Sequence, residues 1–227
     1  MSATVSVIVP TLNESAHVTA TLSPLQHIRR SGHEIILVDG GSDDGTRDVA
    51  SSQVDRVMTG PRGRALQLNV GAREARGDTL LFLHADTVIS PEAIAAFLDE
   101  FPSSRWVWGR FDVRLSGSHF MFRVVENMMN IRSRLSGIAT GDHAIFVRRE
   151  TFEKVGCYPE IPLMEDIAIS RRLKREGRPF CPSRPIVTSS RRWEENGIPR
   201  TILLMWRLRL AYALGADPRG LARSYYS

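Results

Sequence analysis

An uninterrupted apolar run that ends in two polar residues most limits how this chain can fold. Residues 80–83 are all apolar, and they are followed at once by His84-Ala85-Asp86. A run of this length predicts a β-strand buried on both faces, as in a parallel sheet. Open α/β sheets bind ligands at the carboxyl ends of their strands. Since alternate strand residues share a side, His84 and Asp86 could reach one ion or phosphate together.

Two earlier segments repeat the order of strand, loop and helix. Residues 4–9 are rich in β-branched side chains and end at Pro10, which cannot donate to a central ladder. Residues 34–38 lead into 39–46, an acidic, glycine-rich loop that either binds a nucleotide or forms a turn with an Asp helix cap. This loop is neither GxGxxG nor GxxxxGK[ST], which argues against a dinucleotide or P-loop site. Alternating strands and helices predict an α/β fold with a mostly parallel central sheet flanked by helices.

The second part of the chain has a different pattern. Residues 106–115 alternate apolar and polar side chains and predict one long, half-exposed strand. Residues 119–136 predict an amphipathic helix, with Phe120, Val124, Met128, Ile131 and Leu135 at helical spacing and Arg123, Glu126, Asn127 and Asn130 on the polar face. The other expected elements are a helix capped by Asn13 or Ser15 that runs to about Arg30, strands at 55–59, 144–148 and 185–190, and helices at 65–75, from Ser90 to about Phe101, from Arg149, at 165–176 and at 201–215.

Length and charge limit the class of protein. The 227 residues favour one domain. The net charge of +5 is carried almost entirely by Arg, which suits phosphate contacts, although a GC-rich genome would give the same bias. The basic residues are scattered, so no nucleic-acid partner is expected. There is no signal-peptide pattern, no apolar run of about 18 residues and no metal spacing around Cys157 and Cys181. A cytoplasmic protein is therefore expected.

Two later features each leave alternatives open. Glu165 and Asp166 begin a predicted helix, where the helix dipole favours carboxylates whether or not they have a catalytic role. In the helix at 201–215, Arg207 and Arg209 lie about 200° apart, so the helix has no clean polar face. That helix could pack on the domain, form a homodimer contact or make a peripheral membrane contact at the inner face of the membrane. Packing is the preferred interpretation.

Several stretches resemble a known family. SVIVPTLNE, ILVDGGSDDGT and GRALQLNVGAREARGDTLLFLHADT are similar to the nucleotide-binding half of family 2 glycosyltransferases, which have a GT-A fold, and GDHAIFVRRETFEKVGCYPEIPLMEDIAISRRL resembles their acceptor half. The resemblance implies one domain over 1–227, with a nucleotide-binding half at about 1–88 and an acceptor half with a C-terminal helix at about 89–227. RSRLSGIATGD, TSSRRWEENG and MWRLRLAYALG resemble a small bacterial subgroup labelled radical-SAM-associated or arsenosugar-biosynthesis glycosyltransferases.

On the donor side, the resemblance implies a divalent cation, Mg²⁺ or Mn²⁺. Asp86 matches the last Asp of the DxD signature and would hold this metal on the diphosphate, and His84 stands where the first Asp is expected. Asp39 would bind the base, and Glu14 would lie near the ribose or base. The remaining candidates for the nucleotide pocket are Pro10, Thr11, Asn13, Gly41 and Ala85, with Arg62, Arg64, Arg191 and Arg192 as candidate phosphate contacts, of which at most two are expected to bind.

On the acceptor side, Asp166 matches the catalytic base of the family's ED motif, and Glu165 is the neighbouring alternative. SSRRW keeps only Arg192 and Trp193 of the QxxRW motif of processive members. Their transmembrane segments are also missing, so transfer of a single sugar is expected. Asp142 and His143 are further candidates for contacts to the acceptor or the metal.

The expected function is an inverting, metal-dependent glycosyltransferase. Its donor would be a nucleoside-diphosphate sugar, with a UDP-sugar preferred, and its acceptor a small-molecule or lipid-linked hydroxyl compound. One alternative is a sugar nucleotidyltransferase, but that class has a glycine-rich loop directly after the first strand, where this chain has PTLNE. The other is a non-catalytic nucleotide-sugar-binding protein of the same fold. The presence of both Asp86 and Asp166 favours an enzyme.

Overall fold

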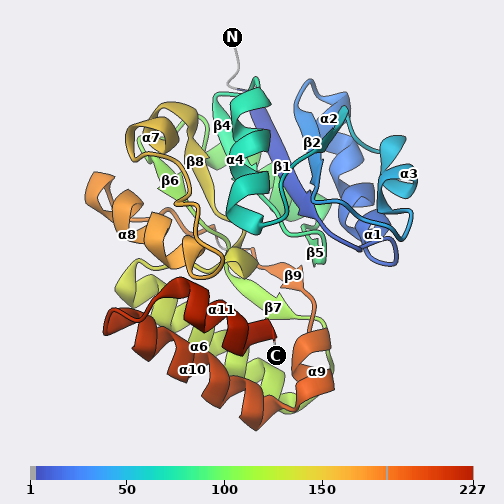
Figure 1. Cartoon of the computed structure of the whole chain (residues 1–227). Helices are drawn as coiled ribbons and strands as arrows, with labels where there is room; N and C mark the ends of the chain where they lie inside the picture. The colour runs from blue at the N-terminus through green and yellow to red at the C-terminus, as the bar shows by residue number, and fades with distance from the viewer. Residues whose placement is uncertain (1–3, 183, 227) are drawn as a thin grey trace.

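The buried runs form the centre of an α/β sheet. The computed structural model describes residues 4–182 and 184–226. Over this part of the chain the central sheet has six strands in the order β3-β2-β1-β4-β8-β6 (Figure 1). Only β8 runs against the other five, so the sheet is mostly parallel, as predicted. The strands are β1 (Val5–Thr11), β2 (Glu34–Asp39), β3 (Arg56–Thr59), β4 (Thr79–Phe82), β6 (Trp108–Gly109) and β8 (Phe146–Arg148).

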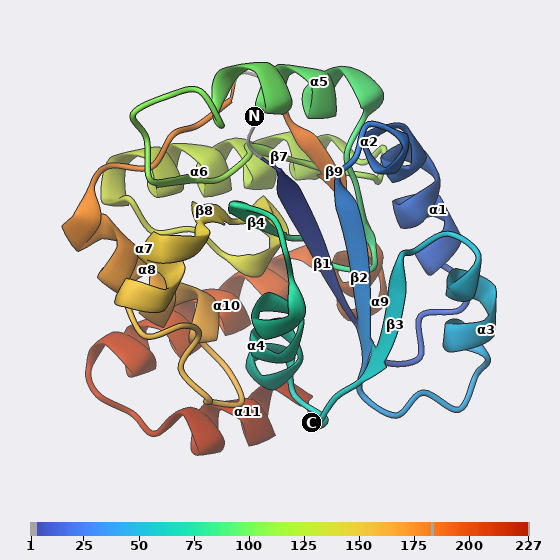
Figure 2. The same ribbon diagram turned by 90° about the horizontal axis from the view of Figure 1, so that it is seen from above.

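Helices cover both faces of this sheet (Figure 2). One face packs on α1 (Val18–Leu22), α2 (Gln26–Arg30), α3 (Thr46–Ser51) and α5 (Pro91–Glu100). The other packs on α4 (Arg64–Glu74), α7 (Arg149–Lys154) and α8 (Glu165–Glu176). Leu81 of β4 lies in the first of these cores, and Leu80 and Phe82 lie in the second. The strand is therefore buried on both faces, which confirms the prediction from its apolar run.

Pro10 and Pro24 affect the strand and the helix that contain them differently from the prediction. Pro10 lies inside β1, which pairs with β4 only as far as Ile8 but continues along β2 to Thr11. Pro10 is tolerated because β1 has become an edge on its β4 side by that point. The helix expected to run to Arg30 is divided into α1, a 3₁₀ turn η1 (Ser23–Leu25) and α2, with Pro24 in the turn. Its first residue follows His17, so neither Asn13 nor Ser15 is its cap.

The single long strand expected at 106–115 is two short strands. β6 belongs to the central sheet, whereas β7 (Val113–Leu115) joins a small sheet with β5 (Thr87–Val88) and β9 (Ile186–Thr188). Between them Arg110 is completely buried and is paired with Asp112. Alternation of apolar and polar residues reports which side chains point inward, but it does not report a change of sheet between strands that share this pattern.

The amphipathic helix forms as α6 (Phe120–Ser136), but it packs through Phe122, Val125 and Glu126 and not through the predicted apolar positions. Glu126 and Asn130 of the polar face accept hydrogen bonds from backbone N–H groups of β7, at 2.8 Å from Leu115 and 2.9 Å from Val113. These polar side chains satisfy the edge of the small sheet. The apolar positions Phe120, Val124, Met128, Ile131 and Leu135 are instead 44–83% exposed.

A layer of helices closes the molecule beyond the carboxyl ends of the parallel strands (Figure 1). It consists of α6, α9 (Arg191–Asn196), α10 (Ile198–Ala213) and α11 (Pro218–Tyr226). The helix α11 was not predicted. α10 packs on the rest of the chain through residues that include Thr201 and Leu208, as the preferred interpretation stated. Within the described residues, none of the helices combines the length and apolar character needed to cross a membrane.

Candidate active site

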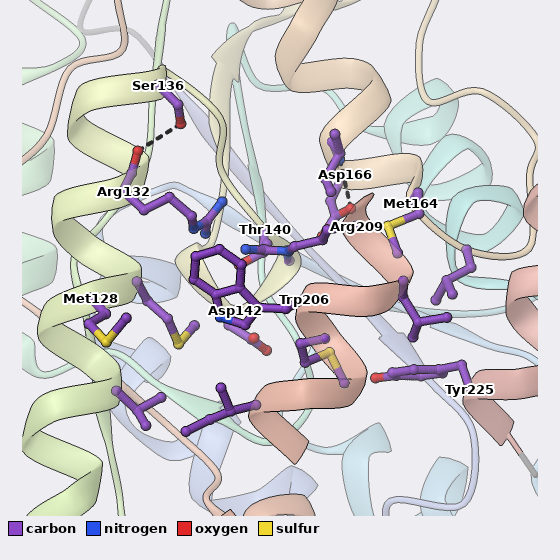
Figure 3. Close-up of a pocket in the computed structure, with 18 of the residues that line it drawn as sticks. Met128, Arg132, Ser136, Thr140, Asp142, Met164, Asp166, Trp206, Arg209 and Tyr225 are labelled. Atoms are coloured by element: carbon purple, nitrogen blue, oxygen red, sulfur yellow. Dashed lines mark hydrogen bonds between the residues drawn. The ribbon is translucent and has the colours of Figure 1, made fainter. Parts of the chain in front are cut away.

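A cavity of about 710 Å³ lies between the end of β4 and the helices α6, α8 and α10 (Figure 3). It brings together residues that are far apart in the sequence. The nucleotide-binding half contributes Arg64 and His84, and the acceptor half contributes Asp142, Glu165, Asp166 and Trp193. The two halves recognised in the sequence therefore face each other across one space.

Backbone hydrogen bonds fix the turn that follows β4. The hydroxyl of Thr21 donates to the carbonyl of Ala85 at 2.7 Å, and the N–H of Ser189 donates to the carbonyl of Asp86 at 3.2 Å. Ala85 is itself buried. The turn is thus held from two sides through its main chain, and the side chains of His84 and Asp86 are left for other contacts.

The ring of His84 packs against the short 3₁₀ turn η2 (Gly141–His143). A side chain at Gly141 would bring a Cβ atom within 2.3 Å of this ring, so glycine is required there. His84 Nδ1 lies 3.8 Å from an oxygen of Asp142. Burial, helped by the charge of Arg64, lowers the pKa of His84 to about 3. The imidazole is therefore neutral, which is the form that binds metals.

The carboxylates of Glu14, Asp86 and Asp142, which come from three segments, lie near enough to one another for repulsion. Burial and then the charge of Asp86 raise the pKa of Glu14, and the same two causes raise that of Asp142 to about 6. One buried oxygen of Glu14 has no hydrogen-bond partner. A divalent cation would relieve this repulsion and suits these oxygen donors. Among the residues described, no three His, Cys, Asp or Glu side chains could enclose a metal ion, so other ligands would come from substrate phosphates and water.

Asp39 organises the loop that follows β2. Its side chain is completely buried. One oxygen accepts hydrogen bonds from the N–H groups of Gly41 and Ser42 at 3.0 and 2.8 Å, and the other accepts one from the hydroxyl of Thr11 at 3.1 Å. A turn held by an Asp side chain is therefore present, but the N-cap of α3 is Gly45 and makes no side-chain cap hydrogen bond, so the predicted Asp helix cap does not form. Contact between Asp39 and a nucleotide base stays a prediction.

The segment after β1 and the loop after β2 form one unit. Asn13 donates through its N–H to the hydroxyl of Ser42 at 2.9 Å, and its side chain accepts from the N–H of Asp43 at 3.1 Å. Gln67 of α4, which the sequence did not single out, donates to the carbonyls of Thr11 and Val38, both at 2.8 Å. The residues predicted to line the nucleotide pocket are thus tied together at the ends of β1 and β2.

The acidic pair at the start of α8 is divided by the fold. Asp166 accepts hydrogen bonds from the N–H groups of Gly141 and Ile167, at 3.0 and 2.7 Å, and lines the cavity. The side chain of Glu165 is 3% exposed and pairs with Arg64 at 3.2 Å. Glu165 is therefore committed to a bridge between the two halves, whereas Asp166 is oriented by two backbone donors.

Replacement of Arg64 by Met should destabilise the protein by about 1–3 kcal/mol near neutral pH, because it leaves Glu165 buried without its partner. Burial already raises the pKa of Glu165, and loss of Arg64 would raise it further. A carboxyl whose pKa is raised by folding opposes folding once the pH exceeds its unfolded pKa. The deficit should therefore be nearly absent at about pH 4 and grow toward about pH 7.

Urea unfolding at the two pH values measures this deficit. Arg62→Met is the matched control, since Arg62 lies two residues earlier, just before α4, is exposed and does not line the cavity. A deficit of equal size at both pH values would show that the bridge to Glu165 is not its cause.

Arg191 and Arg192, two further candidates for phosphate contacts, make different interactions. Arg191 lies 3.8 Å from Glu14 and joins the start of α9 to the loop after β1. The guanidinium of Arg192 lies 3.6 Å from the centre of the Tyr225 ring and donates to the Tyr225 carbonyl at 2.7 Å. Arg192 thus holds α11 in place. Trp193 lines the cavity.

Sequence reasoning missed two cavity residues, Arg132 of α6 and Arg209 of α10. Burial lowers the pKa of both. Arg207, by contrast, is exposed. Because the helix has no clean polar face, its sequence did not indicate which arginine points inward. An Arg within an apolar helix does, however, indicate that one of its arginines makes a buried contact.

Comparison with known proteins identifies the family. The model of glycosyl transferase family 2 matches residues 6–156, which is more than half of the chain. The chain belongs to glycosyl transferase family 2. Poly-β-1,6-N-acetyl-D-glucosamine synthase of Staphylococcus epidermidis is 25% identical over 98% of this chain and 57% of its own length. The PGL/p-HBAD biosynthesis glycosyltransferase of Mycobacterium bovis is 30% identical over 67% of this chain and 62% of its own length. This family 2 chain thus spans about three fifths of these relatives.

Solved structures confirm the predicted GT-A fold. TarS 1–349 of S. aureus superposes with a TM-score of 0.66 at 20% identity and covers 82% of this chain and 60% of that one. The mannosyltransferase PcManGT of Pyrobaculum calidifontis, in complex with GDP-Man and Mn²⁺, superposes with a TM-score of 0.63 at 22% identity and covers 91% and 60%. At this level of identity the similarity establishes the fold of the family 2 chain.

Proposed function

We propose that this family 2 chain is an inverting, metal-dependent glycosyltransferase that moves one sugar from a nucleoside-diphosphate sugar to an acceptor hydroxyl. The observation that carries the proposal is the position of Asp166. Asp166 lines the same cavity as His84, and His84 stands two residues before Asp86 on the turn after β4. Family membership supports transfer of a glycosyl group over the nucleotidyltransferase alternative. The relatives named as glycosyltransferases support it further.

In the proposed reaction the acceptor oxygen forms a bond to the anomeric carbon. The bond from that carbon to the diphosphate breaks, and the nucleoside diphosphate leaves. Asp166 takes the proton from the acceptor hydroxyl, since a carboxylate can act as a general base. Its two backbone hydrogen bonds hold it in one orientation, which lowers the cost of positioning. Attack from the side opposite the diphosphate inverts the anomeric centre.

Asp86 and His84 are the residues proposed to hold Mg²⁺ or Mn²⁺. A bound cation supplies charge that stabilises the departing diphosphate. A carboxylate suits either ion, and a neutral imidazole favours Mn²⁺ of the two. The structural neighbour PcManGT was solved with Mn²⁺, which supports this choice.

The remaining parts of the proposal concern organisation and substrate. We propose that residues 1–227 form one GT-A domain, because β6 and β8 from the acceptor half complete the sheet begun by the nucleotide-binding half. Transfer of one sugar is preferred over polymerisation because Ser189 replaces the Gln of the QxxRW motif. A UDP-sugar as donor, membership of the radical-SAM or arsenosugar subgroup, a cytoplasmic location and a dimer or membrane contact of α10 stay predictions.

A thermal-shift screen of UDP-, GDP- and dTDP-sugars with Mg²⁺ or Mn²⁺ tests the function. A donor at a hundredfold excess over its Kd should stabilise the protein by about 2.7 kcal/mol, which is roughly 5–10 °C in Tm. The shift should require the metal. Release of the nucleoside diphosphate should then be measured with the donor that binds. If none of the donors gives a metal-dependent shift, the proposed function is wrong.

A further inference from the structure

We propose that the acceptor is an anionic amphiphile, whose oxyanion, such as a phosphate, binds Arg132 and Arg209 and whose apolar body lies in the groove between α6 and α10. This inference rests on the proposed function, because it names the class of molecule whose hydroxyl Asp166 would activate. Three observations carry it: the lining of the cavity, the side chains around its mouth and the two buried arginines.

The lining of the cavity is apolar away from Asp166. Its walls include four methionines from three different segments, Met128 and Met129 of α6, Met164 before α8 and Met205 of α10. Methionine is unbranched and polarisable, so a wall built from it adapts to flexible apolar ligands. A sugar or another small polar acceptor would leave most of this surface without a suitable partner. A volume of about 710 Å³ is large enough for an acceptor head group together with part of a hydrocarbon chain.

The apolar surface continues out of the cavity. Met128, Ile131 and Leu135 of α6 and Trp206 of α10 line the cavity, yet they are 51, 58, 83 and 61% exposed. Side chains that belong both to the wall and to the outer surface form an open apolar mouth. An acceptor with a long apolar chain would cover them, and exposed apolar surface of this kind marks binding sites.

Two arginines lie inside this apolar space. Arg132 extends from α6 and Arg209 from α10 toward the same part of the cavity (Figure 3). One terminal nitrogen of Arg132 is buried without a hydrogen-bond partner. The side chain of Arg209 makes neither a hydrogen bond nor an ion pair within 4.0 Å to the residues described. Buried guanidinium groups normally have partners, so both are available for a bound oxyanion, for which Arg has the preferred geometry.

The positive charges near Arg132 also favour an anionic ligand. After burial, the largest cause that lowers the pKa of Arg132 is the positive charge of Arg209, followed further down by Arg110. Asp142 and Asp166 act in the opposite direction on both arginines, although neither forms an ion pair with them within 4.0 Å in the part of the chain that the structure describes. An oxyanion between the guanidinium groups would remove their mutual repulsion.

These arginines belong to the acceptor side of the site. Arg132 and Arg209 line the cavity together with Asp166, the proposed base, whereas Asp86 is not among the lining residues. Both arginines are also influenced by the charge of Asp166. An anionic group held there would therefore belong to the acceptor and not to the donor diphosphate.

Isothermal titration calorimetry with decyl phosphate, below its critical micelle concentration, tests the inference directly. Decyl phosphate should bind at least about tenfold more tightly than inorganic phosphate, because only the amphiphile covers the apolar groove. It should also bind at least about tenfold more tightly than uncharged decyl maltoside, because only the phosphate engages the arginines. Equal affinity for decyl phosphate and either of the other two probes would overturn the inference.

Variants then assign the two parts of the ligand. Arg132→Gln and Arg209→Gln should each weaken decyl phosphate binding by about tenfold, whereas the exposed matched control Arg207→Gln should not change it. Met128→Ser should weaken decyl phosphate and leave inorganic phosphate unaffected. Its control is Leu203→Ser, since Leu203 is 70% exposed on α10 and does not line the cavity. Because Arg132 and Arg209 have no ion-pair partner within residues 4–182 and 184–226, their replacement should not lower the urea midpoint.

Binding of UDP with Mn²⁺ separates this inference from the proposed function. Arg132→Gln and Arg209→Gln should bind UDP with Mn²⁺ as the wild type does. A loss of UDP affinity in these variants would assign the arginines to the donor and overturn the acceptor inference. Wild-type protein that binds UDP with Mn²⁺ but not decyl phosphate would overturn only the acceptor inference. Failure to bind any nucleotide or donor sugar would count against the proposed function itself.

Discussion

Asp166→Asn should reduce the rate of sugar transfer by roughly 10²–10⁴-fold while leaving donor binding unchanged. Asn has nearly the same shape as Asp, and its carbonyl oxygen can still accept one of the two backbone hydrogen bonds that hold Asp166. The amide cannot accept the proton of the acceptor hydroxyl, so the loss should fall on the chemical step. Because the change leaves the turn after β4 intact, the donor and its metal should bind as before.

Transfer and binding must be measured separately to test this expectation. Single-turnover transfer reports the chemical step, and calorimetry with UDP and Mn²⁺ reports the donor site. Asp99→Asn is the matched control, because Asp99 is exposed on α5, far from the cavity lining. Unimpaired turnover by Asp166→Asn would remove Asp166 as the base. A Glu165→Gln variant would then show whether the neighbouring carboxylate acts in its place.

Asp86→Ala should weaken metal-dependent binding of the nucleoside diphosphate by about 100-fold or more, which corresponds to about 2.7 kcal/mol. The protein offers few ligands for a cation, so loss of one carboxylate cannot be compensated from neighbouring side chains. The fold should survive, because the contact that Asp86 makes with Ser189 uses the Asp86 backbone carbonyl. Removal of Asp86 should also lower the pKa of Glu14, since Asp86 is the largest charge that raises it.

Calorimetric titration with UDP, with and without Mn²⁺, measures this effect. Affinity without metal should be similar in Asp86→Ala and in the wild type, and the gain on adding Mn²⁺ should be lost only in the variant. Asp99→Ala controls for loss of a surface carboxylate. If the variant keeps the full gain from Mn²⁺, Asp86 is not a metal ligand. His84→Ala in parallel would report whether the imidazole contributes, with a smaller loss expected.

Local sequence patterns were sufficient to predict the elements whose own residues indicate where they begin or that they are buried. The apolar run before His84 predicted a central strand because four successive apolar residues can be buried only when both faces are covered. Ser90 and Pro91 predicted the start of α5, and the Ser90 side chain does accept a hydrogen bond from the N–H of Ala93. Such signals lie within a few residues of one another, so no knowledge of the fold is needed to read them.

Patterns failed where a distant segment decided the outcome. The spacing of Phe120, Val124 and Met128 identified α6 as an amphipathic helix, but it could not show that Glu126 and Asn130 would be used to satisfy the edge of β7. An unpaired strand edge must find hydrogen-bond partners. Glu126 and Asn130 therefore face β7, and the predicted apolar positions stay largely exposed, with Met128, Ile131 and Leu135 at the cavity.

By itself the sequence identified the family and the mostly parallel sheet, and it singled out Asp86 and Asp166 as candidate site residues. Only the tertiary structure decided how the two members of each pair are used. Arg64, about a hundred residues away, pairs with Glu165, whereas Asp166 lines the cavity without an ion-pair partner among the residues described. The packing of α10 turns Arg209 inward and Arg207 outward. The physical reason is that burial of a charge depends on partners brought close by folding, and spacing along the chain does not contain that information.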